Sequence, residues 1–296
     1  MKFEGVYVPI ITPFDDDMAI DFDAFGDVID WQIENGSHGI IVGGSTGEFF
    51  ALSQEDRLTQ FEFAAKRIAG RIPLIAGIND LLADRCYALA AAAREAGADA
   101  LLVAAPPYSL PSQEELLEHC LKIDRIADLP IMLYNYPGRT GVCMEEAFLD
   151  GVAQSQNVCA IKESSGDIDR IQLLAHAYPQ LQLSAGAEHQ VLEFFAWGAR
   201  SWVSVVANFF PKEAVGFYET CVLQGDFVTG RKMMNAFLPL MYCLEKGDKF
   251  LQSVKYACEL MDRPGGPVRP PLQAMNDDAR SEVSKMVQAA KAALNN

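Results

Sequence analysis

The sequence is short of the residues and runs that indicate a metal enzyme, a secreted disulfide protein or a membrane protein. Its four histidines form no HExxH motif, and its seven cysteines are widely spaced and form no CxxC pair. These patterns argue against a zinc site and a disulfide framework, and they are typical of reduced intracellular thiols. No uncharged apolar run approaches the roughly 20 residues needed to cross a bilayer.

Basic charge is also scarce. The chain has 24 Lys and Arg against 40 Asp and Glu, a formal net charge of −16. Because an acidic surface repels nucleic acid and anionic lipid, we expect neither as a partner. Residues 1–5 show no basic segment leading into an apolar stretch, so no secretory signal is visible and we expect a cytoplasmic protein.

Hydrophobic residues are abundant, at 50% of the 296 positions, which is enough for a large core. Short β-branched or apolar runs recur with starts 19 to 35 residues apart, about the length of one β/α unit. Most are followed by a stretch with helical periodicity. We expect strands at 5–11, 38–42, 73–76, 100–103, 131–134, 158–162, 182–185 and 201–205.

Capping residues support the intervening helices. Ser53 precedes a helical stretch at 57–69, Ser112 opens another at 114–126, and a third covers 82–96. Eight strands alternating with helices predict an α/β fold, an eight-fold parallel β/α (TIM) barrel, because eight strands close a barrel. A doubly wound open sheet is the alternative, and the even spacing of the units favours the barrel.

The rhythm changes after the eighth unit. Three helical stretches without strands follow, at 226–245, 248–260 and 277–293. We therefore expect two parts, a β/α barrel catalytic domain at 1–224 and a C-terminal helical extension at 225–296.

In barrel enzymes the catalytic side chains lie at the C-terminal ends of strands. Alternation along the sixth strand puts Val158, Ala160 and Lys162 on one face. If this face points inward, Lys162 enters the barrel mouth, where desolvation lowers its pKa and yields an amine that attacks carbonyls. A solvated lysine at a strand end is the alternative that the pattern leaves open.

Three further strand ends carry polar groups. Tyr134 ends the fifth strand and can move protons, and Arg139, five residues on, can hold a carboxylate. Residues 43–48 (GGSTGE) combine glycines with two hydroxyls, a turn suited to a small anion. Tyr108 is displayed on a proline-rich loop after the fourth strand. Packing or turn formation explains each motif alone, but their joint placement less readily.

These segments resemble the dihydrodipicolinate synthase and N-acetylneuraminate lyase superfamily of class I aldolases, from residue 5 to about 272. The segments that carry the resemblance are GGSTGE (43–48), YNYPGRTG (134–141), IKES (161–164), SAG (184–186) and SVVAN (204–208). It implies an eight-fold barrel with a C-terminal helical extension. It also implies a homodimer or a homotetramer built as a dimer of dimers, working without metal or other cofactor.

The resemblance also implies roles for the matched residues. Lys162 matches the lysine that forms a Schiff base with pyruvate or another 2-keto acid. Ser45 and Thr46 match the hydroxyls that bind its carboxylate, and Thr46 also matches a proton-relay residue. Tyr134 matches the tyrosine that protonates and deprotonates the intermediate, and Tyr108 a relay tyrosine from a neighbouring subunit.

Three more residues complete the expected substrate site. Gly186 matches the position at which the backbone of family members contacts the bound keto acid. We also expect Val205, within SVVAN, to bind substrate. Arg139 matches an arginine that meets the carboxylate of aspartate semialdehyde in dihydrodipicolinate synthases. The expected activity is therefore a lyase of lysine biosynthesis that condenses pyruvate with this carboxylated aldehyde.

Two segments depart from the synthase pattern. Synthases usually show an Asn-Pro-Ile-Pro-type segment before the lysine matched by Lys255, where this chain has FLQSV at 250–254. The stretch GGPVRPPL at 265–272 resembles paralogues that act on sugar acids or other keto acids. A paralogous 2-keto-acid aldolase or dehydratase is therefore the alternative. A non-catalytic binding scaffold is a third, which the retained lysine and tyrosine disfavour.

The resemblance bears on inhibition by lysine as well. Lysine-sensitive relatives place histidines just after the GE loop and a second tyrosine beside the relay tyrosine. Gln54 and Arg57 stand at the histidine positions here, and Pro107 at that of the tyrosine. Proline offers no ring face to an ammonium, and Arg57 would repel it, so we expect no strong inhibition.

Overall fold

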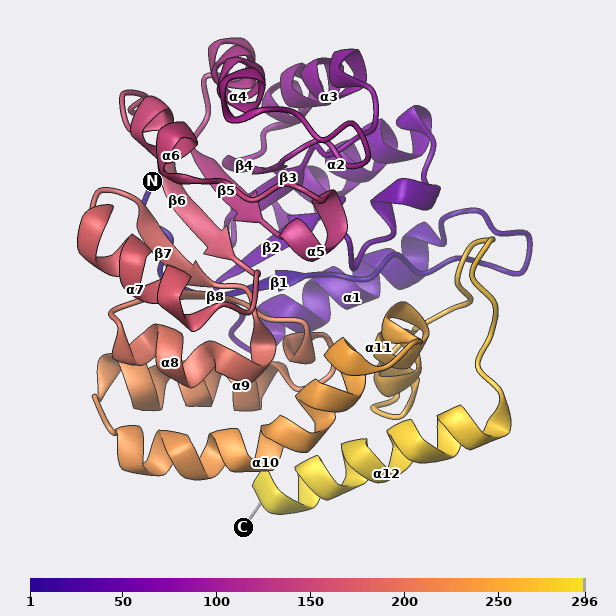
Figure 1. Cartoon of the computed structure of the whole chain (residues 1–296). Coiled ribbons are helices and arrows are strands. Elements are labelled where there is room, and N and C mark those ends of the chain that lie inside the picture. The colour runs from indigo at the N-terminus through magenta and orange to yellow at the C-terminus, as the bar shows by residue number, and fades with distance from the viewer. Residues whose placement is uncertain (295–296) are drawn as a thin grey trace.

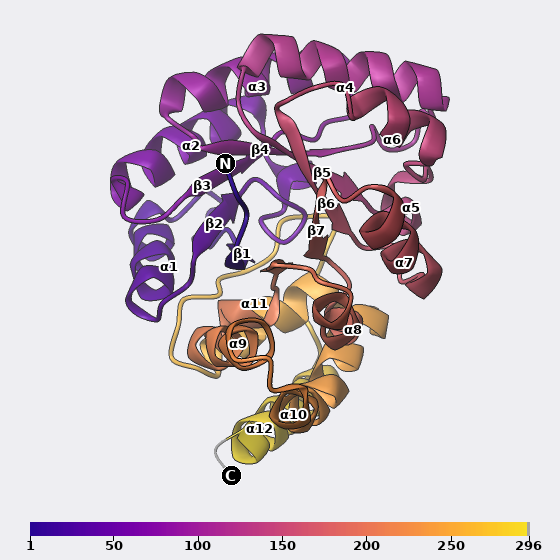
Figure 2. The same cartoon turned by 90° about the vertical axis from the view of Figure 1, so that its left-hand side faces the viewer.

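The eight predicted strands form a closed barrel. The structure is a computed structural model that describes residues 1–294, and within it eight parallel strands pair in chain order, with β8 closing on β1 (Figures 1 and 2). The predicted TIM barrel is thus confirmed over the open sheet. The strands are β1 Gly5–Pro9, β2 Gly39–Val42, β3 Leu74–Gly77, β4 Ala100–Ala104, β5 Ile131–Asn135, β6 Val158–Glu163, β7 Gln182–Ala185 and β8 Ser201–Val203.

Helices follow the strands and surround the barrel, which is the arrangement expected of repeated β/α units (Figure 2). Several connections carry short helical turns at the C-terminal ends of strands. The helices of the ring are α1 Phe22–Glu34, α2 Gln54–Ile68, α3 Ala83–Ala96, α4 Gln113–Ala127, α6 Glu146–Val152, α7 Ile168–Ala177, α8 Val191–Ala196 and α9 Pro211–Tyr218. The short turns are η1 Phe49–Ala51, α5 Pro137–Thr140, η2 Glu188–Gln190 and η3 Val206–Asn208.

Side-chain caps set the starts of two helices. The Ser53 hydroxyl accepts a hydrogen bond from the backbone N–H of Asp56, whose carboxylate accepts one from the N–H of Ser53. Ser112 and Glu115 make the same reciprocal pair, which confirms the predicted capping box. Because the cap lies directly before the helix, α2 begins three residues earlier than the predicted 57.

The barrel interior is apolar below the mouth. Its side chains come from alternate positions of the strands, as a sheet of period two requires. At the level of the predicted site this inner cluster includes Ala104, Tyr134 and Ala160, beneath and beside Lys162. Deeper members are Phe3, Tyr7, Ile41, Ile75, Ala100, Leu102, Met132 and Val203.

Three helices follow the barrel, as predicted: α10 Phe227–Lys246, α11 Phe250–Glu259 and α12 Asp277–Leu294. They follow η4 Glu219–Leu223, and α10 packs against both α8 and α12 (Figure 1). The division of the chain at residue 224 stays a prediction, and positions 295–296 of the predicted extension lie outside the described residues. No helix within 1–294 is long and apolar enough to span a membrane.

Candidate active site

Lys162 lies on the inner face of the barrel, as its alternation with Ala160 predicts. Its side chain is buried, at 6% exposure, near the end of β6. In the register of the sheet it stands beside Tyr134 of β5 and Ser184 of β7. The alternative of a solvated lysine is therefore wrong for this residue.

Burial gives this amine its chemistry. Desolvation lowers the pKa of Lys162 to about 8, although the carboxylates of Glu188 and Glu245 act in the opposite direction. About one-tenth of such amines are unprotonated at pH 7, far more than for an ordinary lysine. Lys162 is therefore equipped to act as a nucleophile towards a carbonyl.

Tyr134 lies directly against this amine. The Nζ of Lys162 is 4.0 Å from the centroid of the Tyr134 ring. Burial raises the pKa of the phenol well above its ordinary value, while a hydrogen bond with the Ser45 side chain acts to lower it. The phenol is therefore protonated at neutral pH and is in place to donate a proton near the lysine.

The GGSTGE turn brings the Ser45 side chain to the same mouth. Thr46 is buried, and Ser45 is partly buried beside Tyr134. The turn is tight because the N–H of Gly47 donates to the carbonyl of Gly44 and that of Glu48 donates to the carbonyl of Ser45, each at 3.1 Å. The structure thus brings Lys162 and the Tyr134–Ser45 pair together, as the motifs predict.

Gly186 is needed as glycine. A Cβ built on it would lie 2.8 Å from Cγ of Lys162 and would collide with Oγ of Ser164. The Gly186 backbone therefore lies against the lysine, in agreement with its predicted position. Val205 is buried, and both of its backbone polar groups are used: its N–H donates to Glu188 and its carbonyl accepts from Asn208. Only its side chain is therefore available to contact a substrate.

Arg139 and Tyr108 lie further out. Arg139 is exposed on α5, and its charge still acts to lower the pKa of Tyr134. Tyr108 is 92% exposed, with a positive φ of 74°, and its ring projects into solvent instead of joining the lysine of its own chain. Within one chain the structure therefore does not bring Tyr108 to Lys162.

A carboxylate pair beside the lysine was not among the predicted residues. Glu188, in η2 after β7, is buried, and its carboxylate accepts hydrogen bonds from the N–H groups of Val205 and Val206. Glu245, from α10, accepts from the Glu188 N–H at 2.7 Å and also contacts Nδ1 of His189. The position of Glu188 just after a strand was a usable signal, but nothing in the sequence places a residue of α10 here.

The chain is similar to known proteins over nearly its whole length. A 4-hydroxy-tetrahydrodipicolinate synthase of Neisseria gonorrhoeae is 34% identical over 292 residues, covering 97% of this chain and 98% of the relative. The synthase of Methanocaldococcus jannaschii is 34% identical over 291 residues, covering 97% and 98%. A crystal structure of dihydrodipicolinate synthase from Aquifex aeolicus superposes with a TM-score of 0.92 at 31% identity, covering 99% and 100% of the two chains.

A buried strand-end lysine beside a tyrosine, in a closed β/α barrel with a helical extension, defines a lyase of the class I aldolase type. The chain belongs to the dihydrodipicolinate synthetase family, whose family model matches residues 2–290. The family assignment made from the motifs is confirmed.

Proposed function

We propose that this protein condenses pyruvate with aspartate semialdehyde, the reaction of a 4-hydroxy-tetrahydrodipicolinate synthase. The observation that carries the proposal is the buried Lys162 amine, with its pKa lowered to about 8, against Tyr134. The synthases named above, similar over nearly their whole length, support the same reaction. The assignment of residues to roles is our proposal.

The first half of the reaction uses the buried side of the site. The Lys162 amine attacks the keto carbon of pyruvate, and loss of water from the adduct gives the imine. Ser45 and Thr46 hold the pyruvate carboxylate, and the Gly186 backbone lies along the same substrate. Tyr134 donates the proton with which the keto oxygen leaves as water, and then accepts the methyl proton as the enamine forms.

The second half uses the outer residues. The enamine carbon attacks the aldehyde carbon, whose oxygen takes a proton from the Tyr134 side of the site. Arg139 binds the carboxylate of the semialdehyde, because a guanidinium pairs with a carboxylate through two parallel hydrogen bonds. The amino group of the semialdehyde then attacks the imine carbon, which closes the ring and releases Lys162.

Borohydride trapping tests the covalent step. Pyruvate with borohydride should add one reduced pyruvyl group to the peptide that contains Lys162, and Lys162→Ala should abolish both labelling and turnover. Labelling of Lys255 or Lys66 instead would overturn the assignment. An unlabelled protein would support the scaffold alternative.

A substrate panel tests the second substrate. A coupled assay should offer pyruvate with aspartate semialdehyde beside several 2-keto-3-deoxy sugar acids. The segments 250–254 and 265–272, which depart from the synthase pattern, are the reason to include the sugar acids. Turnover of a sugar acid without turnover of the semialdehyde would show that the protein is a paralogous aldolase or dehydratase and not a synthase.

We also propose that the site is completed in a homodimer or homotetramer. Tyr108 and Leu110 are 92% and 60% exposed, and both have positive φ angles. Large exposed side chains on a strained loop are typical of a surface that another subunit covers, since the contact offsets the strain. Sedimentation equilibrium measures the assembly, and Tyr108→Phe should keep it while slowing turnover.

The cytoplasm is our proposed location. All seven cysteines are free, and four of them are buried. Free thiols in this number are maintained in a reducing compartment. Fractionation of cells that express the chain tests this location.

A further inference from the structure

A buried carboxylate follows the predicted carboxylate-binding turn. Glu48 lies two residues after Thr46, is fully buried, and has a φ of +58°, a conformation that side-chain-bearing residues rarely adopt. Such a backbone persists only where its surroundings hold it. Both groups that hold its carboxylate come from the C-terminal part of the chain, beyond the barrel.

The first group is Lys255 of α11. Its Nζ lies 2.6 Å from Oε1 of Glu48, donates to the carbonyl of Pro267 at 2.5 Å, and sits 4.4 Å from the centroid of the Phe14 ring. Lys255 is only 2% exposed. The partners of this buried cation therefore come from three places: Glu48 of the turn, Phe14 of the loop after β1, and Pro267 of the segment that follows α11.

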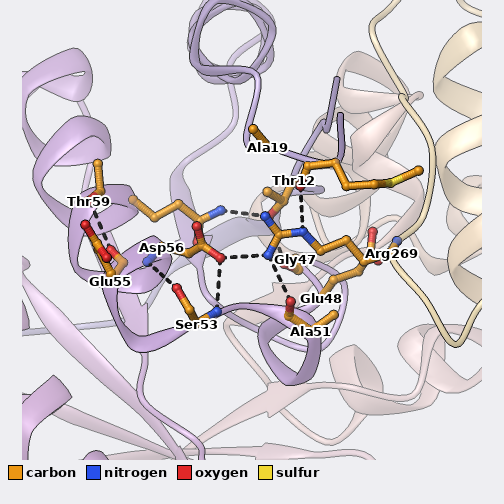
Figure 3. Close-up of polar contacts among 12 residues, drawn as sticks. Thr12, Ala19, Gly47, Glu48, Ala51, Ser53, Glu55, Asp56, Thr59 and Arg269 are labelled. Carbon is orange, nitrogen blue, oxygen red and sulfur yellow. Dashed lines mark hydrogen bonds and ion pairs between the residues drawn. The ribbon is translucent and has the colours of Figure 1, made fainter. Parts of the chain in front are cut away.

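The second group is Arg269, in the segment between α11 and α12. Its backbone N–H donates to Oε2 of Glu48 at 3.1 Å. Its guanidinium donates to the carbonyls of Met18 and Ala51, and it pairs with Asp56 at 2.7 Å (Figure 3). Asp56 also caps α2, which follows the turn, whereas Met18 precedes the turn in the chain. Arg269 therefore connects the C-terminal extension to segments before and after the GGSTGE turn.

The contacts continue into the residues expected to bind substrate. The N–H of Glu48 donates to the carbonyl of Ser45 at 3.1 Å. The hydroxyl of Thr12 donates to the carbonyl of Gly47 at 2.7 Å, beside Glu48 (Figure 3). A change in the position of Glu48 therefore moves the backbone of Ser45 directly. None of these contacts lies between barrel strands, so closing the barrel does not require them.

We propose that Lys255 and Arg269 are positioning residues, through which the C-terminal extension holds Glu48 and thereby sets the Ser45–Thr46 turn for the substrate carboxylate. The inference rests on the proposed function, since it assumes that this turn binds the 2-keto acid. It predicts that loosening these contacts weakens binding of the keto acid without changing the lysine chemistry.

The test compares three variants of the full chain. Glu48→Gln with Lys255→Met removes both buried charges together, which avoids leaving one of them unpaired. Arg269→Gln removes the guanidinium contacts and leaves the backbone bond to Glu48. Tyr256→Phe is the matched control, because its hydroxyl contacts Ser284 of α12 and not the turn.

The readout is borohydride trapping at a series of pyruvate concentrations. We expect the concentration for half-maximal trapping to rise about tenfold or more in the double variant and several-fold in Arg269→Gln, because small displacements of binding groups have large effects. The trapping rate at saturating pyruvate should stay close to that of the unmodified protein. Tyr256→Phe should match the unmodified protein in both.

Every other outcome either contradicts the inference or shows that the proposed function is wrong instead. A half-maximal concentration within twofold of the unmodified value in folded variants would overturn it, as would an equal rise in Tyr256→Phe. Circular dichroism and urea unfolding first establish that each variant is fully folded, because a reversibly unfolded population would itself raise the half-maximal concentration. If the double variant fails to fold, Arg269→Gln decides by the same criterion. If the unmodified protein itself is not labelled by pyruvate, the proposed function fails instead.

Discussion

Glu245 of α10 accepts a hydrogen bond at 2.7 Å from the backbone N–H of Glu188, which places two carboxylates in the electrostatic surroundings of Lys162. Desolvation by burial, with the nearby charge of Glu245, raises the pKa of Glu188 to about 8. The C-terminal extension thus reaches the active site from two directions, here through α10 and at the GGSTGE turn through α11. In both places the extension contacts a segment that follows a barrel strand, η2 after β7 and the GGSTGE turn after β2.

The pH dependence of imine formation should report the lysine. Because the pKa of Lys162 is lowered to about 8, half of the amine is unprotonated at that pH, and the fraction levels off about one unit above it. We expect the initial rate of borohydride trapping by pyruvate to increase from pH 6 to about pH 9 and to change little above it. A rate that continues to climb towards pH 10 would contradict the lowered pKa.

Glu188 should make the protein less stable as pH rises. Its pKa is ordinarily 4.5 and is about 8 in the folded protein, so the folded state binds more protons between these values. Stability from this group is therefore lost as pH rises from about 4.5 to about 8. Glu188→Gln removes the effect, so the unfolding free energy of the unmodified protein should fall relative to that of the variant over this range.

Urea unfolding at several pH values between 4.5 and 8 measures this difference. Glu193→Gln on the exposed surface of α8 is the matched control, since it removes an equal charge from the same region. Parallel pH curves for the unmodified protein and Glu188→Gln would show that the folded protein leaves Glu188 ionised.

The sequence pattern locates the strands well, and the two largest errors, at the ends of the first and last strands, have one cause. The first strand was predicted at 5–11 and the last at 201–205, but β1 ends at Pro9 and β8 at Val203. Ile10, Ile11 and Val205 are buried, so an apolar pattern extends past the strand. At Val205 the backbone has already turned into a helical conformation, with ψ at −39°. Residues therefore stay buried after the strand has ended, because the loops pack over the barrel mouth.

The site was predictable where one strand or turn supplies the group. Alternation placed Lys162 inward because Ala160 and Lys162 share a face of β6. Glu245 and Lys255 were not predictable in this way. Helical periodicity indicates which face of α10 or α11 is buried, but the contact partner depends on how the extension packs on the barrel, which no local pattern specifies.

Arg139 should recognise the second substrate and not pyruvate. Its guanidinium is exposed at the outer edge of the site, on α5, whereas Lys162 and Tyr134 are buried. Arg139→Ala should leave trapping by pyruvate nearly intact. It should lower kcat/KM for aspartate semialdehyde by a factor that corresponds to a loss of about 1.5–3 kcal/mol of transition-state stabilisation, the range for a hydrogen bond to a charged group. Steady-state kinetics with varied semialdehyde, beside trapping titrations with pyruvate, separate the two. An equal loss of pyruvate binding would assign the arginine to the first substrate or to the fold.

Lysine should inhibit this protein weakly, for a reason that differs in part from the one expected. Arg57 was expected to face a bound ammonium and repel it, but its side chain is 1% exposed and donates to the carbonyls of Gly77 and Asn79. It is therefore committed to the interior of the subunit. The expectation then rests on Pro107, which stands where the resemblance places a tyrosine in lysine-sensitive relatives and offers no aromatic ring to an ammonium.

A direct comparison tests this prediction. The dihydrodipicolinate synthase of Cyanidioschyzon merolae, which was solved with lysine bound, serves as the positive control. Calorimetric titration with lysine, alongside the coupled assay, should show binding to that protein and none at submillimolar lysine here. Pro107→Tyr adds the missing ring but leaves Gln54 and Arg57 at the positions where the resemblance expects histidines, so it should strengthen binding only modestly. Half-inhibition of the unmodified protein by submillimolar lysine would contradict the prediction and show that the lysine site has been rebuilt from other residues.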